Sequence, residues 1–160
     1  MDMLTTQLNR MAEAAIGFCA LVDDFDKMSV DVWLERLTTI LPELQQAITE
    51  LDKNETLGLY EPAPDYDARF ALFTKLYEGL GERGGFDEEF DRQDGQRLSG
   101  SLADDITDIY FDLKRGLSLL KDNPDKPRIA MQEWQSSFEL HWRHHLTDVE
   151  RQLHQFEASH

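Results

Sequence analysis

The sequence predicts an all-α protein, an antiparallel helical bundle of four long helices plus one shorter helix. Apolar residues recur at intervals of three and four along most of the 160 residues, which is the period of a helix with one buried face. No segment alternates apolar and polar side chains as a half-buried strand does. The length suits one domain, so we expect residues 1–160 to form a single helical-bundle domain.

The first two expected helices each carry an unbroken apolar stripe. The first stripe consists of Leu4, Leu8, Met11, Ala15, Phe18, Val22 and Phe25. The second consists of Val30, Trp33, Leu37, Leu41, Leu44, Ile48 and Leu51. Ser29 is the expected N-cap of the second helix. Pro42 lies inside this helix, and because the stripe continues in phase across it, we predict a kinked helix rather than a new one.

A third, shorter helix is expected from Asp65 to Leu80. Its inward side chains are predicted to be Phe70, Phe73, Leu76, Tyr77 and Leu80. Two glycines, Gly79 and Gly81, are placed to end it.

Two connections flank this third helix. The stretch 54–64 contains one glycine and two prolines and is predicted to be a loop. The stretch 81–98 is long, rich in glycine and acidic, which predicts a second loop, either a flexible surface segment or a functional lid. In the first case Phe86 and Phe90 attach the chain to the core, and a short helix at Phe86–Arg92 is an alternative.

The clearest helix is expected at 101–122. Ser101 and Asp104 form the S-x-x-D pattern of a helix start, and early aspartates suit the positive end of the helix dipole. The segment 123–127 contains two prolines and predicts a sharp break. A final long helix then runs from about Arg128 to Ala158.

The composition excludes several classes of function. Acidic residues outnumber basic ones by 32 to 16, which gives a net charge of −16 and disfavours binding to nucleic acids or anionic membranes. The single cysteine, Cys19, permits no internal disulfide and no cysteine-based zinc site. No apolar run is long enough to span a bilayer, and the polar first residues do not resemble a signal peptide. We therefore expect a cytoplasmic protein, with a protein partner or a homodimer left open.

All five histidines lie at or after His141. On a helical wheel of about 100° per residue, His141 and His145 fall within about 20° of Trp134, in the middle of the apolar face. A buried imidazole requires hydrogen-bond partners or a metal ion. This pair is therefore the first candidate for a functional site.

A stripe of carboxylates, Asp105, Asp108 and Asp112, flanks the apolar face of the 101–122 helix. Like charges at these spacings repel, so a compensating cation is expected, whether arginine, lysine, imidazolium or a metal ion. We expect the last two long helices to pack antiparallel, with the aspartates facing His141 and His145.

Three interpretations of this pairing remain open. In the first, His141 and His145 hydrogen-bond to Asp105, Asp112 or Tyr110 and form a structural polar network. In the second, the histidine pair and Asp105 or Asp112 bind a divalent metal ion such as zinc, manganese, iron or nickel. In the third, one or both histidines point partly into solvent and recognise a ligand or partner.

The segment SLADDITDIYFDLKRGL at 101–117, followed by W-x3-F-E-x-H-W-x2-H-x2-D at 134–148 and Leu153-His154, resembles the bacterial domain-of-unknown-function family DUF5063. The positions that carry the resemblance are Ser101, Leu102, Asp104, Asp105, Asp108, Asp112, Leu113, Gly116, Trp134, Phe138, Glu139, His141, Trp142 and His145. The resemblance implies a compact helical bacterial protein without an established activity. It also implies that the aspartate-rich segment and the H-W-x-x-H segment form one unit.

Two functions are consistent with these observations. The leading hypothesis is a non-enzymatic binding or interaction module with a structural Asp–His network. The alternative is a metal-dependent enzyme, a hydrolase in which the ion activates water. The chain contains no glycine-rich phosphate loop, G-x-S-x-G motif or C-x-x-C motif that would favour other chemistry.

Overall fold

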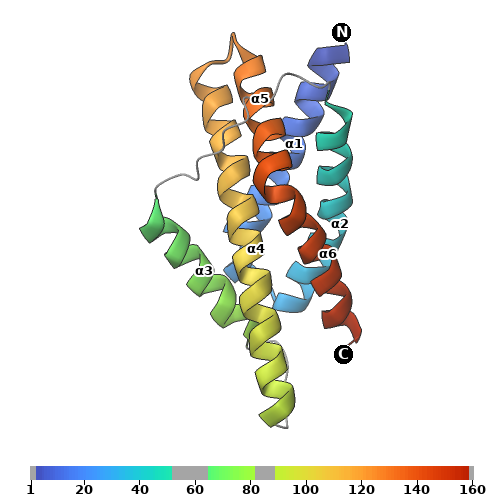
Figure 1. Cartoon of the computed structure of the whole chain (residues 1–160), viewed down its shortest axis with the longest axis vertical. Coiled ribbons are helices and arrows are strands. Elements are labelled where there is room, and N and C mark those ends of the chain that lie inside the picture. The colour runs from blue at the N-terminus through green and yellow to red at the C-terminus, as the bar shows by residue number, and fades with distance from the viewer. Residues whose placement is uncertain (1–2, 52–64, 82–88, 159–160) are drawn as a thin grey trace.

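The structure, a computed structural model, describes residues 3–51, 65–81 and 89–158 (Figure 1). The loop predicted at 54–64 and the residue Phe86 lie outside these ranges. Every regular element within them is helical. The elements are α1 (Met3–Asp23), the 3₁₀ turn η1 (Phe25–Lys27), α2 (Val30–Glu50), α3 (Tyr66–Gly81), α4 (Glu89–Asp122), α5 (Pro127–Ser137), the π-helical turn η2 (Phe138–Trp142) and α6 (Arg143–Ala158).

The helices form an antiparallel bundle (Figure 1). Its long members are α1, α2, α4 and the run from α5 through η2 to α6, and the shorter α3 packs against the outside of α4. This arrangement confirms the predicted all-α bundle of four long helices plus one shorter helix. None of the described helices is both long and apolar enough to cross a lipid bilayer.

The apolar stripes predicted for the first two helices supply much of the core. On α1, Met11, Phe18 and Val22 have no exposed surface, as predicted. Phe25 is also buried, but it lies in η1 because α1 ends at Asp23. The stripe therefore continues past the end of the helix, and the tight turn keeps the last aromatic ring in the core.

The second helix has the predicted start and passes through its proline. The Ser29 side chain accepts a hydrogen bond from the backbone N–H of Val32 at 3.2 Å, which makes it the N-cap. Pro42 lies inside α2, and Leu41 and Leu44 on either side of it are both buried. The proline therefore starts no new helix, as the continuous stripe predicted.

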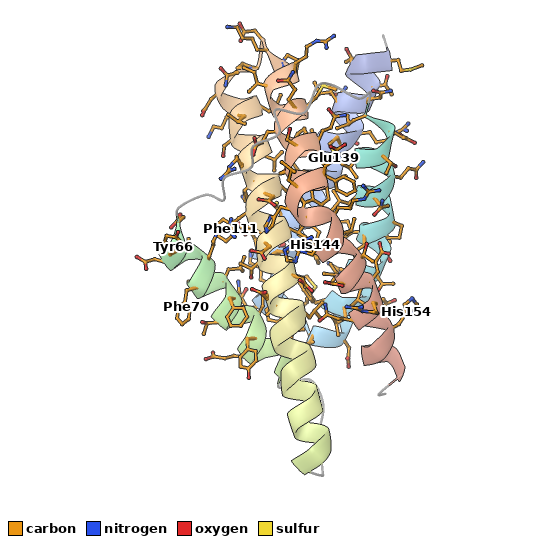
Figure 2. All side chains as sticks on the ribbon, viewed as in Figure 1. Tyr66, Phe70, Phe111, Glu139, His144 and His154 are labelled. Carbon is orange, nitrogen blue, oxygen red and sulfur yellow. The ribbon has the colours of Figure 1, made fainter. Side chains whose placement is uncertain are left out.

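The inward face of α3 differs from the prediction at one position. Leu76 and Leu80 are buried, but Phe70 is 71% exposed and faces away from α4 (Figure 2). On a helical wheel Phe70 lies about 120° from Leu76, whereas Arg69 lies only about 20° from it. The buried face of α3 therefore presents Arg69 where the sequence analysis placed Phe70.

The fourth helix begins earlier than predicted. α4 starts at Glu89, so Ser101 lies inside the helix and the predicted loop at 81–98 is wrong from residue 89 onward. Of the short helix proposed at Phe86–Arg92, the part from Glu89 onward is the first turn of α4. The segment 89–100 contains two glutamines, two arginines, one glutamate and one leucine, which are good helix formers. Its two glycines cost about 1 kcal/mol each, which is too little to interrupt a helix of this length.

The predicted final helix is present, but it contains a π-helical turn. Pro127 occupies the first helical turn of α5, where its missing N–H costs nothing. The turn η2 then inserts extra backbone before α6 begins. Inside it the rings of Phe138 and Trp142 meet edge to face at 4.6 Å, and Trp142 donates from Nε1 to Ser137 Oγ at 3.0 Å. These buried contacts stabilise the irregular turn.

Candidate metal centre

Two histidines of the last helical run face carboxylates of α4. His141 Nδ1 lies 2.5 Å from Asp112 Oδ2, and His145 Nδ1 lies 2.6 Å from Asp105 Oδ1. The side chains of Asp112 and Asp105 are only 1% and 8% exposed. Each imidazole is therefore held by a buried carboxylate on its Nδ1 side, which directs the opposite nitrogen, Nε2, away from that carboxylate.

Asp108 lies between the two rings on their Nε2 side. Its Oδ2 atom is 3.2 Å from His145 Nε2 and 3.9 Å from His141 Nε2. One donor atom from each of Asp108, His141 and His145 lies within 4.8 Å of the other two. Two nitrogens and one carboxylate oxygen thus form a group of donors that could hold one metal ion.

The second oxygen of Asp108 is held from another helix. Arg69 of α3 donates from Nη1 to Asp108 Oδ1 at 2.9 Å. Its guanidinium also lies over the ring of Phe111, 5.0 Å from the ring centroid, on the α3 side of α4 (Figure 2). The Nε and Nη2 atoms of Arg69 are buried without a hydrogen-bond partner among the described residues. The Asp108 carboxylate is therefore the main compensation for this buried charge.

Asp105 is held by a second residue of α6. Gln152 donates from Nε2 to Asp105 Oδ2 at 2.6 Å and to the backbone oxygen of Asp148 at 3.0 Å. With His145 on Oδ1, both oxygens of Asp105 have partners. This carboxylate is therefore fixed in orientation and in turn fixes the ring of His145.

The π-helical turn overlaps this cluster in the sequence. His141 is inside η2 and His145 is in the first turn of α6. Their ring centroids are 4.8 Å apart. π-helical turns often occur at functional sites because one extra residue re-aims the neighbouring side chains. Here the turn accompanies two imidazoles that meet the same aspartate.

The electrostatics of the cluster follow from its crowded carboxylates. Burial alone lowers the pKa of His145, but the hydrogen bond to Asp105 and the charge of Asp108 outweigh it, so its pKa is raised. The pKa of Asp104, which is exposed on α4, is also raised by partial desolvation and by the charges of Asp108 and Asp105. The cluster therefore favours positive charge at its centre.

The net charge can be balanced in two ways. Asp105, Asp108 and Asp112 carry three negative charges when ionised, and Arg69 carries one positive charge. Two imidazolium ions cancel the remainder. One divalent cation bound by two neutral imidazoles has the same effect.

The structure brings together all five residues singled out in the sequence, and it gives them different positions. Asp105 and Asp112, considered there as metal ligands, lie on the Nδ1 side of the rings. Asp108, named there as part of the carboxylate stripe and not as a metal ligand, lies on the Nε2 side with both histidines. The other described histidines lie outside this set of donors.

Two residues of the cluster were missed in the sequence analysis. Arg69 had a signal, because it is in phase with Leu76 and Leu80 on the buried face of α3. Gln152 follows His145 by seven residues, or about two turns, and so lies on the same face of α6. Neither spacing indicates on its own which aspartate the side chain contacts.

The fold and the cluster define a helical-bundle protein with a buried Asp–His centre between two antiparallel helices. Residues 2–159 match the family described as Domain of unknown function (DUF5063), so the chain belongs to that family. The fold is similar to the crystal structure of protein BF1032 from Bacteroides fragilis, with a TM-score of 0.73 and 20% identity over 94% of this chain and 91% of that one. No curated protein matches the sequence.

Proposed function

We propose that this protein binds one divalent transition-metal ion through Asp108, His141 and His145. The observation that carries the proposal is that His141 Nε2 and His145 Nε2 both face Asp108 Oδ2, while each Nδ1 faces a buried carboxylate. Histidines that ligate metals characteristically donate their other ring N–H to a carboxylate or carbonyl, which fixes the tautomer and strengthens the ligand. Both imidazoles here have that arrangement.

The donor set indicates the class of ion. Two imidazole nitrogens and one carboxylate oxygen suit zinc and the neighbouring divalent transition metals better than magnesium or calcium, which prefer oxygen ligands. Three protein donors leave a tetrahedral ion one further position, which water occupies in catalytic zinc sites. The same centre could therefore activate water, which is the chemistry of the hydrolase hypothesis.

A second candidate function is a structural polar network without metal, within a binding or interaction module. His141 and His145 make short contacts with Asp112 and Asp105, and the raised pKa of His145 favours an imidazolium ion paired with Asp105. Such a network fixes the register of two packed helices. It uses the same residues as the metal centre, so measured metal binding distinguishes the two candidates.

The test is metal content by elemental mass spectrometry of untagged protein purified without chelator, before and after loading with zinc, manganese or iron. About one equivalent of metal per chain is expected, as for one three-donor site. The variant His141→Ala/His145→Ala should lose it. The matched control His144→Ala/His154→Ala also removes two histidines but no donor of the centre, and it should retain the metal. No metal in the loaded wild-type protein would overturn the proposal and leave the structural network.

We further propose that the protein acts in the cytoplasm. The support is its single cysteine, Cys19, because proteins of oxidising compartments commonly rely on disulfides. Fractionation of cells that express the full chain tests this location, and recovery in a membrane or exported fraction would contradict it.

A further inference from the structure

We infer that Arg69 of α3 determines the metal selectivity of the centre, because it restricts Asp108 to a single ligating oxygen. This inference rests on the proposed metal binding. It concerns a positioning residue, since Arg69 would act on the ion only through Asp108. Three observations support it: the divided contacts of Asp108, the fixed rings of the two histidines, and the confinement of Arg69.

The two oxygens of Asp108 have separate partners. Oδ1 accepts the hydrogen bond from Arg69 Nη1 at 2.9 Å, and Oδ2 faces the Nε2 atoms of His145 and His141 at 3.2 and 3.9 Å. An ion between the rings therefore meets Oδ2. Bidentate binding would require Oδ1 to leave Arg69 and turn toward the ion.

The histidines offer no compensating freedom. Their Nδ1 atoms lie 2.5 and 2.6 Å from Asp112 and Asp105, and Asp105 is itself held by Gln152. Rotation of either ring would break a contact with a buried carboxylate. The protein therefore presents two nitrogens and one oxygen, a set that matches a four-coordinate ion completed by water.

Arg69 also has little freedom to move away from Asp108. Its side chain is 15% exposed, and its guanidinium lies 5.0 Å from the centroid of the Phe111 ring. Its remaining buried nitrogens, Nε and Nη2, have no partner among the described residues, so leaving Asp108 would strand a buried charge. The helix α3 is thereby linked to the metal centre through one side chain.

Because Arg69 restricts Asp108 to one ligating oxygen, the centre should prefer ions of low coordination number. Zinc accepts four ligands readily, whereas manganese favours more oxygen ligands and gains most from a bidentate carboxylate. Removal of Arg69 frees Oδ1 and should lower the ratio of zinc affinity to manganese affinity. The loss of one positive charge affects every divalent ion alike, so it cancels in that ratio.

The experiment measures zinc, cobalt(II) and manganese affinity by competition with a chromophoric chelator, using the full-length wild type and Arg69→Met. The ratio of zinc to manganese affinity is expected to fall about 10-fold or more in Arg69→Met, since partners of metal ligands commonly affect affinity by about 10–100-fold. The visible absorption of the cobalt(II) form should also weaken, because six-coordinate cobalt(II) absorbs far less than four-coordinate cobalt(II).

Two further variants complete the design. Arg69→Lys keeps the charge with a single donor group and should shift the ratio in the same direction by less, and it carries the test if Arg69→Met fails to fold. Arg115→Met removes another half-buried arginine, which pairs with Glu133 at 3.2 Å and lies about two turns of α4 from Asp108. This control should leave the ratio unchanged.

The outcomes separate the two proposals. In one outcome the wild type binds zinc and cobalt(II), and the folded Arg69 variants have the same affinity ratio and the same cobalt spectrum as the wild type. The selectivity role is then overturned and the metal site stands. If the wild type binds none of the three ions, the metal site is overturned and the selectivity role falls with it.

Discussion

α4 packs against the same helical run at two places, and the two contacts differ in chemistry. Near its C-terminal end Gly116 lets the ring of Trp134 lie directly on the helix, and Trp134 donates from Nε1 to the backbone oxygen of Leu113 at 3.2 Å. Three turns earlier, α4 meets the same run through Asp105 and His145. The contact at Gly116 is apolar and tightly packed, whereas the contact at Asp105 is charged.

The difference shows what each contact does. The Gly116–Trp134 contact buries an aromatic side chain completely and leaves little space for change. The Asp–His contact removes charges from water, and such pairs often contribute little net stability compared with apolar side chains of the same volume. The Gly116–Trp134 contact is therefore explained by its contribution to the stability of the fold. The Asp–His contact is better explained by the ion that it can bind.

The largest effect is expected at the apolar contact. In Gly116→Ala the new Cβ would lie 2.0 Å from Trp134 Nε1, so the buried indole must shift. We expect a loss of about 3 kcal/mol in the free energy of unfolding, measured by urea denaturation. In the control Gly81→Ala the Cβ meets nothing within 4 Å, and stability should change by less than about 0.5 kcal/mol. Equal stability of the two variants would contradict tight packing at Gly116.

Metal binding at the charged contact should stabilise the folded protein by nearly as much as Gly116→Ala destabilises it. With free zinc at about 100 times its dissociation constant, the free energy of unfolding should rise by about 2.7 kcal/mol, because the ion binds the folded chain. His141→Ala removes one donor and should show a much smaller rise under the same conditions. An equal rise in both proteins would mean that zinc binds elsewhere.

Without metal, His141→Ala should have a smaller effect. Asp112, whose side chain is 1% exposed, loses the ring nitrogen at 2.5 Å, which should cost about 2 kcal/mol. In chelator-treated protein, a double-mutant cycle with Asp112→Ala checks whether the two side chains act as a pair. Additive losses, or a His141→Ala variant as stable as the wild type, would rule out a stabilising pair.

The smallest effect concerns a thiol of the apolar core. Burial raises the pKa of Cys19 to about 12, and its Sγ lies 3.9 Å from the backbone oxygen of Tyr110 on α4. Near pH 8 almost no thiolate forms in the folded chain, so iodoacetamide should label Cys19 only after unfolding in guanidinium. Labelling is followed by mass spectrometry. Rapid labelling of the native protein would contradict this expectation and would show that this part of the core opens.

Most of the fold could be predicted from the sequence because each helix carries an apolar stripe of the right period. The stripe cannot show where a helix begins when the preceding segment is polar, which is why the start of α4 at Glu89 was missed. It also assumes a constant rotation per residue, so it contains no signal for the π-helical turn η2. In that turn Phe138 and Trp142 contact each other and Trp142 donates to Ser137, and no apolar period indicates these contacts.

The candidate site could be predicted as a group of residues but not as a geometry. Helical spacing placed the three aspartates and the two histidines on facing helices. Which carboxylate oxygen meets which ring nitrogen depends on the register of two helices, and one sequence does not specify that register. Arg69 comes from a third helix, so its contact with Asp108 depends on how α3 crosses α4.

The most direct test of the metal centre is a crystal structure of the zinc-loaded protein with data collected at the zinc absorption edge. We predict one anomalous peak between α4 and α6, about 2.0–2.2 Å from Asp108 Oδ2 and from the Nε2 atoms of His141 and His145. Well-ordered side chains in this cluster with no peak between them, or a peak at other ligands, would contradict the proposed centre.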